Sequence, residues 1–298
     1  MKRVGFIGIG TIGMPMAKNI VRGGYDVTVF DLAPARIAEM RELGAKGAGS
    51  IAEAVKGQDI VITMLPDAPD VEGAALGAGG ILESIGRDAI YIDMSTIDPA
   101  TTRRVGERFA ARGVRMIDSP VTRSVEQAIT GNLALLIGGD VAVFEEVKPL
   151  LACMADTMTH CGPLGNGSAM KLVNNFMSAG IVSLMSEAMA MGVKAGLTLE
   201  LMIDASSKTG TRNFMLQEFL PSRAFAGNFK AGFFSRLSLK DQRLALSMAE
   251  AGGVEAPVGC TVYGLLEQTA AKYPTDDFCS LIRIREEQAG IQLRLKGK

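Results

Sequence analysis

Short apolar runs alternate with amphipathic stretches over the first half of the chain, from Val4 to about Val143. Six of the runs have the length and the β-branched content of buried strands. They span residues 4–7, 26–30, 60–64, 90–92, 115–118 and 134–137. Stretches with helical periodicity lie between them, for example at residues 14–23 and 34–43. This alternation predicts an α/β fold, with a doubly wound and mostly parallel sheet of the Rossmann type.

The pattern changes after a turn-rich hexapeptide at residues 162–167, and no further strand is expected. The longest helical pattern, residues 168–195, predicts one long central helix. Shorter helices are expected at residues 199–206, 213–220, 237–250, 258–272 and 278–287, and residues 294–298 read as a frayed, solvated tail. We therefore predict a Rossmann domain at residues 1–163 and an all-helical domain at residues 164–298.

The composition of the 298 residues is that of a globular protein, with 48% hydrophobic and 21% charged residues. A formal charge of −1 argues against a nucleic-acid partner, because such proteins usually carry a basic surface. Four cysteines without a C-x-x-C pair indicate reduced thiols rather than a disulfide scaffold. We expect a cytoplasmic protein without a membrane span or a resident metal.

A glycine motif with a physical function follows the first predicted strand directly. It reads Gly8-Ile9-Gly10-Thr11-Ile12-Gly13 and opens the next predicted helix. In that position glycines allow a tight turn and a close approach of the backbone to a pyrophosphate, which the helix N-terminus then faces. The motif predicts a dinucleotide site that includes Thr11 and Ile12. The alternative is a glycine-rich turn without a ligand.

Asp31 ends the second predicted strand, 18 residues after Gly13. A carboxylate at this place hydrogen-bonds the 2′-hydroxyl of the adenosine ribose and repels a 2′-phosphate, which favours NAD over NADP. Asp31 is also placed to cap the helix that starts near Pro34, and the two roles are compatible.

If the dinucleotide transfers a hydride, few residues of the chain are candidates for the proton donor. His160 is the only histidine and is read as structural, and no tyrosine is followed by lysine four places later. Lys171, Asn174, Asn175 and Ser178 form one polar stripe on an otherwise apolar helix. Because burial of an ammonium and two amides is unfavourable, the stripe is expected to line a site. The alternative is a satisfied hydrogen-bond network at an interface.

A second polar cluster lies in the turn 118–124, after a strand on the carboxyl side of the predicted sheet. Thr122, Arg123 and Ser124 offer two hydroxyls and a guanidinium, a combination suited to bind a small anion. The alternative is that Arg123 is an ordinary surface arginine.

These motifs together resemble the β-hydroxyacid dehydrogenase family, which includes 3-hydroxyisobutyrate dehydrogenase and tartronate semialdehyde reductase. The resemblance covers nearly the whole chain. It rests on residues 6–17, on Met64-Leu65-Pro66, on Asp93-Met94-Ser95-Thr96, on Gly165-Asn166-Gly167 leading to Lys171 and Asn175, and on Lys240-Asp241.

The resemblance implies roles for individual residues. Lys171 would be the general acid, Asn175 would orient the reacting oxygen, and Leu65, Pro66, Thr96 and Lys240 would contact NAD. It also implies a homodimer or homotetramer packed through the helical domain.

The sequence departs from the common family pattern at the substrate loop. Most members read Pro-Val-Ser-Gly-Gly, whereas this chain reads Pro120-Val121-Thr122-Arg123-Ser124. A loop with arginine, followed by a segment similar to residues 127–131, characterises the sulfolactaldehyde reductases within the family. Asn174, Phe176, Met177 and Ser178 also resemble their residues, which implies a sulfonate substrate and the reduction of 3-sulfolactaldehyde to 2,3-dihydroxypropane-1-sulfonate. The alternatives are a carboxylate substrate, such as 3-hydroxyisobutyrate or the semialdehydes of tartronate and succinate, and a catalytically silent NAD-binding protein.

Overall fold

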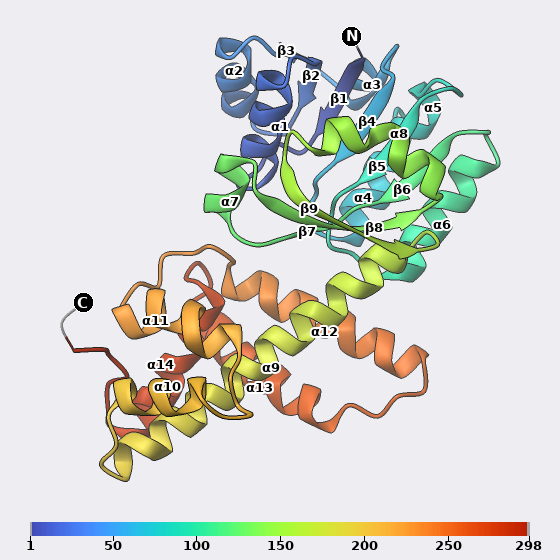
Figure 1. Cartoon of the computed structure of the whole chain (residues 1–298). Helices are drawn as coiled ribbons and strands as arrows, with labels where there is room; N and C mark the ends of the chain where they lie inside the picture. The colour runs from blue at the N-terminus through green and yellow to red at the C-terminus, as the bar shows by residue number, and fades with distance from the viewer. Residues whose placement is uncertain (1, 297–298) are drawn as a thin grey trace. The chain divides into compact units, whose positions relative to one another are not determined.

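The computed structural model describes residues 2–296. The chain divides into two compact units, Met1–Leu172 and Val173–Lys298, which we call the sheet unit and the helical unit. Figure 1 follows the chain from the sheet unit, in blue and green, to the helical unit, in yellow and red. The predicted boundary after residue 163 lies just before the long helix, whereas the two units divide within it.

The sheet of the described residues has nine strands. They are β1 (Arg3–Ile7), β2 (Asp26–Phe30), β3 (Lys46–Gly47), β4 (Ile60–Thr63), β5 (Ile90–Asp93), β6 (Arg115–Asp118), β7 (Val121–Thr122), β8 (Leu133–Gly139) and β9 (Ala155–Gly162). The order is β3-β2-β1-β4-β5-β6-β8-β7, and β9 also pairs with β8. The strands from β3 to β6 are all parallel, and β8 is antiparallel to β6 and β7. The predicted α/β fold is confirmed.

Successive strand residues enter two different cores, because side chains alternate between the faces of a sheet. Ile60 and Ile62 of β4 pack on one face and Val61 on the other. Helices supply both cores, so the sheet is covered on both sides (Figure 1). These helices are α1 (Gly13–Arg22), α2 (Pro34–Glu42), α3 (Ile51–Val55), α4 (Ala68–Leu76), α5 (Ile81–Ser84), α6 (Pro99–Ala110), α7 (Val125–Thr130) and α8 (Val141–Leu151). Burial on both faces explains why the strands read as continuous apolar runs.

Three strands were not predicted. β3 and β7 have two residues each, which is too short for a periodic signal. β9 has eight residues, but its composition is polar and most of its side chains are exposed or half-buried. It runs parallel to β8, and no other pairing of β9 occurs in the described part of the sheet. An edge strand of this kind carries no apolar run by which it can be found.

The helical unit is built on α9 (Asn166–Lys194), the predicted long helix, which begins in the sheet unit and continues into the helical unit. The other α-helices described in this unit are α10 (Leu199–Ser207), α11 (Leu220–Ser222), α12 (Ser235–Ala251), α13 (Pro257–Lys272) and α14 (Leu281–Ala289). Two short 3-10 helices, Ala224–Ala226 and Phe278–Ser280, lie between them. Their apolar faces form one core with Ala179, Val182 and Met189 of α9.

Two predictions for this unit were wrong in detail. The helix expected at residues 213–220 is a π-helix (Met215–Phe219) that continues into α11. The tail expected from residue 294 is held in place through residue 296, because Arg294 pairs with Glu286, and Leu295 and Lys296 donate backbone hydrogen bonds to Phe225 and Glu200. Residues 297 and 298 lie outside the described residues.

α9 is long and apolar enough to cross a bilayer, the one helix among residues 2–296 of which this is true. The core helix of a soluble protein passes the same test, so the observation is weak evidence for a membrane. Only 33% of the most apolar 18-residue stretch of α9 is buried, which leaves much of the helix uncovered.

Candidate functional site

The glycine loop has the geometry that a pyrophosphate needs. Gly8 has a φ of +90°, and a Cβ added there would lie 2.4 Å from the Met64 carbonyl oxygen. A Cβ on Gly13 would lie 2.1 Å from the Gly8 oxygen, so this glycine lets α1 pack directly on the loop. Gly10 faces open space, where the nearest group to an added Cβ is Arg36 Nη1 at 3.7 Å. Gly8 therefore allows the tight turn, Gly10 leaves space for a phosphate to approach the backbone, and Gly13 allows α1 to pack on the loop. This arrangement fits a dinucleotide phosphate at the start of α1.

Thr11 and Ile12 complete this loop. Thr11 is exposed, and Ile12 occupies the N-cap position of α1. No side chain in the described residues caps this helix start. A ligand anion is the usual partner of such a terminus, because its backbone N–H groups point outward and carry partial positive charge.

Asp31 is half-buried at the end of β2 and links three neighbours. Its Oδ2 accepts a hydrogen bond from Ile9 N at 3.0 Å, and its Oδ1 accepts one from Ala33 N at 2.8 Å. Arg36 Nη1 lies 3.5 Å from Oδ2. The carboxylate thus holds the loop that precedes α2 but does not cap α2 itself, whose N-cap is Ala33. Asp31 remains placed to bind a ribose hydroxyl beside the glycine loop.

The other cofactor residues predicted in the sheet unit follow β4 and β5, at the carboxyl edge of the sheet. Leu65 donates its backbone N–H to Ser95 Oγ at 2.9 Å, which ties the two loops together. Pro66 is exposed and Thr96 is half-buried. Open α/β sheets bind their ligands at this edge, so the placement supports the predicted contacts.

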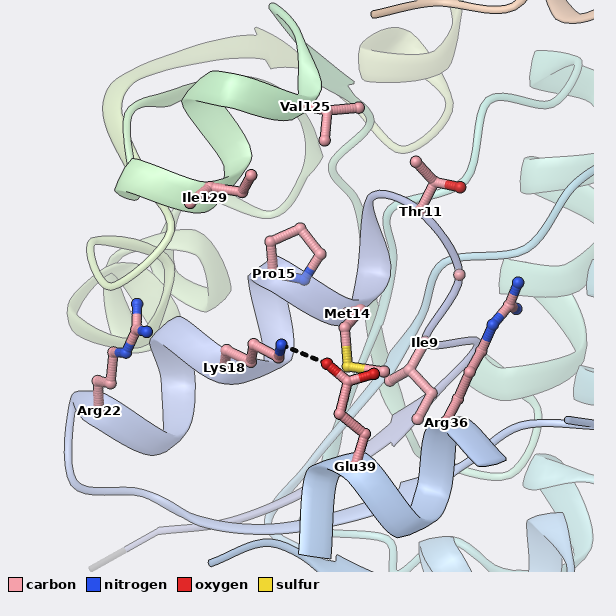
Figure 2. Close-up of a pocket in the computed structure, with 11 residues that line it drawn as sticks. Ile9, Thr11, Met14, Pro15, Lys18, Arg22, Arg36, Glu39, Val125 and Ile129 are labelled. Atoms are coloured by element: carbon pink, nitrogen blue, oxygen red, sulfur yellow. Dashed lines mark hydrogen bonds and ion pairs between the residues drawn. The ribbon is translucent and has the colours of Figure 1, made fainter. Parts of the chain in front are cut away.

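A pocket of about 480 Å³ lies beside the glycine loop (Figure 2). Its walls come from α1, α2 and α7, and Lys18 Nζ bonds Glu39 Oε1 across it at 2.6 Å. It shares only Gly10 and Thr11 with the predicted cofactor residues. Most of it therefore lies outside the expected cofactor site.

The substrate loop has one unusual backbone conformation. Arg123 has a φ of +76°, and no other residue among 2–296 except glycine has a positive φ. Its Nη1 lies 2.7 Å from Asp156 Oδ1 and also donates to the Asn132 carbonyl, while Nη2 donates to Thr157 Oγ1 at 3.0 Å. These contacts use three of the five guanidinium N–H donors. Arg123 therefore has protein partners that hold its side chain in place, and two of its N–H donors remain for a ligand.

The two hydroxyls that flank Arg123 have partners of their own. Thr122 donates to the Ala134 carbonyl oxygen at 3.3 Å. Ser124 is the N-cap of α7, where it forms a capping box with Gln127 and also bonds Glu126. Both hydroxyls can still accept hydrogen bonds from a ligand.

Lys171 lies on the second turn of α9 and is 8% exposed, the one buried lysine among the described residues. Burial of an ammonium group costs free energy, and such burial is typical of lysines that line a functional site. The burial of Lys171 therefore supports a place in the candidate active site. Lys171 and Asn175 are four residues apart on one continuous helix and share a face.

The remaining polar stripe joins a network in the helical unit. Asn175 Nδ2 donates to Asp241 Oδ2 at 2.6 Å, and Asn174 Nδ2 donates to Asn175 Oδ1 at 3.0 Å. Lys240 Nζ lies 3.3 Å from Asp241 Oδ1, and both side chains are largely buried. The network fixes the orientation of the Asn175 amide.

Three further predicted residues lie on the same stretch of α9. Phe176 packs on Gly259 of α13, because a Cβ there would lie 2.4 Å from its ring. Ser178 donates to the Asn174 carbonyl oxygen at 2.8 Å. Met177 is 48% exposed. Phe176 therefore has a packing role, whatever it does for a ligand.

Some residues have simpler roles than catalysis. His160 Nε2 bonds the Gly139 carbonyl oxygen at 2.8 Å, and its ring stacks on Phe144, as a structural histidine does. The four cysteines are unpaired. No group of three or more His, Cys, Asp or Glu within residues 2–296 has the arrangement of a metal site.

Two acidic residues and one serine have structural roles that were not predicted. Asp241 holds the Asn175 amide, Asp118 bonds the start of α9, and Ser95 accepts from Leu65. Asp241 and Ser95 belong to motifs on which the family resemblance rests, but their hydrogen-bond partners lie 66 and 30 positions away in the sequence. Local spacing carries no signal for contacts at such distances.

Two sequence profiles cover the chain in succession. The profile for the NAD binding domain of 6-phosphogluconate dehydrogenase matches residues 3–162. A profile described as the NAD-binding part of NADP-dependent 3-hydroxyisobutyrate dehydrogenase matches residues 165–285.

Individual relatives agree with these profiles. The chain is 33% identical over 293 residues to 3-hydroxyisobutyrate dehydrogenase of Pseudomonas aeruginosa, covering 95% of this chain and 98% of the relative. It is 31% identical over 297 residues to 3-sulfolactaldehyde reductase of Escherichia coli, covering 99% and 100%. The solved structure of Mycobacterium tuberculosis 3-hydroxyisobutyrate dehydrogenase with L-serine is similar at a TM-score of 0.90 and 30% identity, covering 95% of this chain and 99% of that one. This chain is therefore an NAD-dependent oxidoreductase and belongs to the β-hydroxyacid dehydrogenase family.

Proposed function

We propose that this enzyme reversibly reduces a small anionic aldehyde, with Lys171 as the general acid. The observation that carries the proposal is a lysine that is only 8% exposed on the helix that begins beside the carboxyl edge of the sheet. NAD, when bound, supplies or accepts the hydride. Lys171 donates a proton from Nζ to the carbonyl oxygen in the reductive direction and takes it back in the oxidative direction. Asn175, oriented by Asp241, hydrogen-bonds the same substrate oxygen.

The substrate we favour is 3-sulfolactaldehyde. Arg123 stands in the loop where a glycine is common in the family, and it retains two N–H donors beyond its present contacts. A sulfonate has three acceptor oxygens, one more than a carboxylate, and the Asn174 amide adds a further donor.

A carboxylate substrate is the second candidate, and one observation favours it. Arg123 keeps two N–H donors beyond its present contacts, and two is the number of oxygens in a carboxylate. 3-Hydroxyisobutyrate and the semialdehydes of tartronate and succinate belong to this class. The similar identities to relatives of both classes, 33% and 31%, do not separate them.

The proposal is tested by initial rates of NADH oxidation with 3-sulfolactaldehyde, succinate semialdehyde and tartronate semialdehyde. Lys171→Ala should lower kcat on the order of 100- to 10,000-fold with the best substrate. Lys171→Arg should also be inactive, because a guanidinium keeps its proton at neutral pH. Lys194→Ala, an exposed lysine in the last turn of the same helix, is the matched control and should leave the rate unchanged. A Lys171→Ala variant as active as the parent would refute the proposed acid.

Arg123→Ala separates the two substrate classes. Loss of a charge-assisted contact to the sulfonate costs about 2 to 3 kcal/mol, roughly 30- to 150-fold in kcat/KM. A preference for the sulfonate that disappears in the variant would support 3-sulfolactaldehyde. A preference for a carboxylate that the variant retains would support the second candidate.

We also propose that a second copy of the chain covers the outer face of α9. Val173, Met177, Leu184 and Met191 follow one another at intervals of four, seven and seven residues and are 41% to 69% exposed. Such spacing aligns them on one face, which suits a partner helix. Light scattering on the purified protein should show a dimer or tetramer, and Leu184→Glu with Met191→Glu should give monomers. A parent protein that is already monomeric would refute the interface.

A further inference from the structure

Asp118 is the last residue of β6, and it is fully buried. Its Oδ1 accepts a hydrogen bond from Gly165 N at 2.7 Å. Its Oδ2 accepts from Ser168 N at 2.6 Å and from Ser168 Oγ at 3.0 Å. All three donors belong to the first turn of α9 or to the residue just before it. One carboxylate from the sheet therefore holds the start of the longest helix.

The surroundings of this carboxylate are built from glycines. A Cβ on Gly138 would lie 2.3 Å from Asp118 Oδ1, and a Cβ on Gly167 would lie 2.8 Å from Oδ2. Gly165 has a φ of +87°. The motif Gly165-Asn166-Gly167 thus has a physical reason that the cofactor site does not supply: it lets α9 approach the carboxylate closely.

The arrangement resists displacement for two reasons. The negative carboxylate lies at the N-terminus of a 29-residue helix, where the backbone dipoles favour an anion. Ser168 Oγ is also 3.1 Å from Thr102 Oγ1 of α6, so the same turn is tied to a second element. Burial raises the pKa of Asp118, whereas the hydrogen bonds from Gly165 and Ser168 favour the ionised form.

Lys171 comes three residues after Ser168, one turn further along α9. The position of a residue on a rigid helix is set by the contacts of the neighbouring turns. We propose that Asp118 is a positioning residue, which holds the first turn of α9 so that Lys171 stays aligned at the carboxyl edge of the sheet. The inference rests on the proposed role of Lys171 as the general acid.

Asp118→Asn tests this with little change of shape. The asparagine oxygen can still accept from Ser168 N, but the amide nitrogen then faces Gly165 N, donor against donor. Misplacement of a reacting group by about 1 Å lowers the rate on the order of 100-fold. We expect kcat to fall about 10- to 100-fold, while the dissociation constant of NADH, measured by fluorescence titration, changes less than about twofold.

Asp277→Asn is the matched control. Asp277 is also buried, at 1% exposure, and its carboxylate accepts three backbone hydrogen bonds, from Gly232, Phe233 and Cys279. It lies in the helical unit, outside the residues assigned to the site. Asp277→Asn should lower the melting temperature by an amount similar to that of Asp118→Asn but leave kcat of the folded enzyme within about twofold. Equal kcat values in the two variants would overturn the positioning role.

A double-mutant cycle isolates the path through Lys171. In a Lys171→Ala background, Asp118→Asn should reduce the residual rate less than about twofold, because there is no lysine left to misplace. A reduction as large as that in the parent would overturn the inference. Should Lys171→Ala itself prove fully active, the proposed acid fails. Hydrogen exchange then decides the inference separately: faster exchange at residues 168–172 in Asp118→Asn than in Asp277→Asn supports the anchoring of α9, and equal exchange refutes it.

Discussion

Arg123 Nη1 lies 2.7 Å from Asp156 Oδ1, and this pair joins the substrate loop to the edge strand β9. The pKa of Asp156 lies below its usual value, because its carboxylate accepts hydrogen bonds from Thr157 and Arg123. The carboxylate is therefore ionised at neutral pH, and any anion bound by Arg123 meets a negative neighbour.

Asp156→Asn should strengthen the binding of an anionic substrate. The asparagine oxygen still accepts from Arg123, but the repulsion is removed, which we expect to lower KM for 3-sulfolactaldehyde about three- to tenfold. Steady-state rates with NADH in excess measure the effect. Asp140→Asn, at the N-cap of α8, is a neutral control because asparagine caps as well as aspartate. An unchanged or higher KM in Asp156→Asn would argue against Arg123 as an anion ligand.

Arg123→Gly should be more stable than Arg123→Ala. Both variants lose the same guanidinium, but only glycine adopts a φ of +76° without strain, a difference of about 1 kcal/mol. Urea unfolding of the two variants measures the difference directly. Equal stability would mean that the loop relaxes to another conformation when the arginine is removed.

Gly10→Ala should weaken the cofactor without weakening the fold. The added Cβ meets no atom closer than Arg36 Nη1 at 3.7 Å, but it projects into the space that the pyrophosphate needs. We expect the dissociation constant of NADH to rise on the order of tenfold or more and the melting temperature to stay unchanged. Gly73→Ala, which also meets open space but lies within α4, should affect neither quantity adversely. Tight NADH binding by Gly10→Ala would place the phosphates elsewhere.

Asp31→Asn should reduce the preference for NADH over NADPH. The carboxylate repels a 2′-phosphate, and its removal leaves Arg36, now 3.5 Å from Asp31, available as a cation for that group. The ratio of kcat/KM for the two cofactors should shift toward NADPH by about tenfold. Asp26→Asn is the control. It removes the carboxylate of β2 that pairs with Lys46, and the ratio of kcat/KM for NADH and NADPH should stay unchanged. A parent enzyme that prefers NADPH would contradict the role of Asp31.

Asp93→Asn should change how stability depends on pH. Burial raises the pKa of Asp93 above its ordinary value of 3.8, and no group in the described residues bonds its Oδ2. The folded state therefore keeps this proton to higher pH than the unfolded state, so the contribution of Asp93 to stability falls as pH rises through that interval. Asparagine does not titrate, so the Asp93→Asn variant does not lose stability in this way as the pH rises. Its free energy of unfolding relative to the parent should increase from about pH 4 to about pH 7 in urea titrations. A relative stability that declines with pH would show that the carboxylate is ionised in the fold.

The sequence predicted the parts of the molecule whose causes are local. Ile60, Val61 and Ile62 of β4 alternate between two cores, so all three are apolar, and a continuous apolar run is easily recognised in the sequence. The glycine loop and the burial of Lys171 were likewise predicted, because each depends on neighbouring residues of one element.

The contacts that were not predicted join distant parts of the chain. Asp156 lies 33 positions from Arg123, on a polar edge strand that had no apolar pattern. Asp118 caps α9 from 47 and 50 positions away, beyond the reach of the usual helix-start signals. For this reason the sequence did not predict the partners of Arg123, which the structure shows to be Asn132, Asp156 and Thr157.

The positive φ of Arg123 also bears on how this loop can evolve. A single nucleotide change converts a glycine codon into an arginine codon. The backbone at this position has a conformation that glycine adopts freely, so the exchange alters the chemistry of the loop without a new path for the chain. A sequence with glycine here would need no insertion, deletion or new turn to acquire a cation. Given the proposed role of Arg123, an exchange between glycine and arginine at this position is a route to a different substrate that leaves the backbone unchanged.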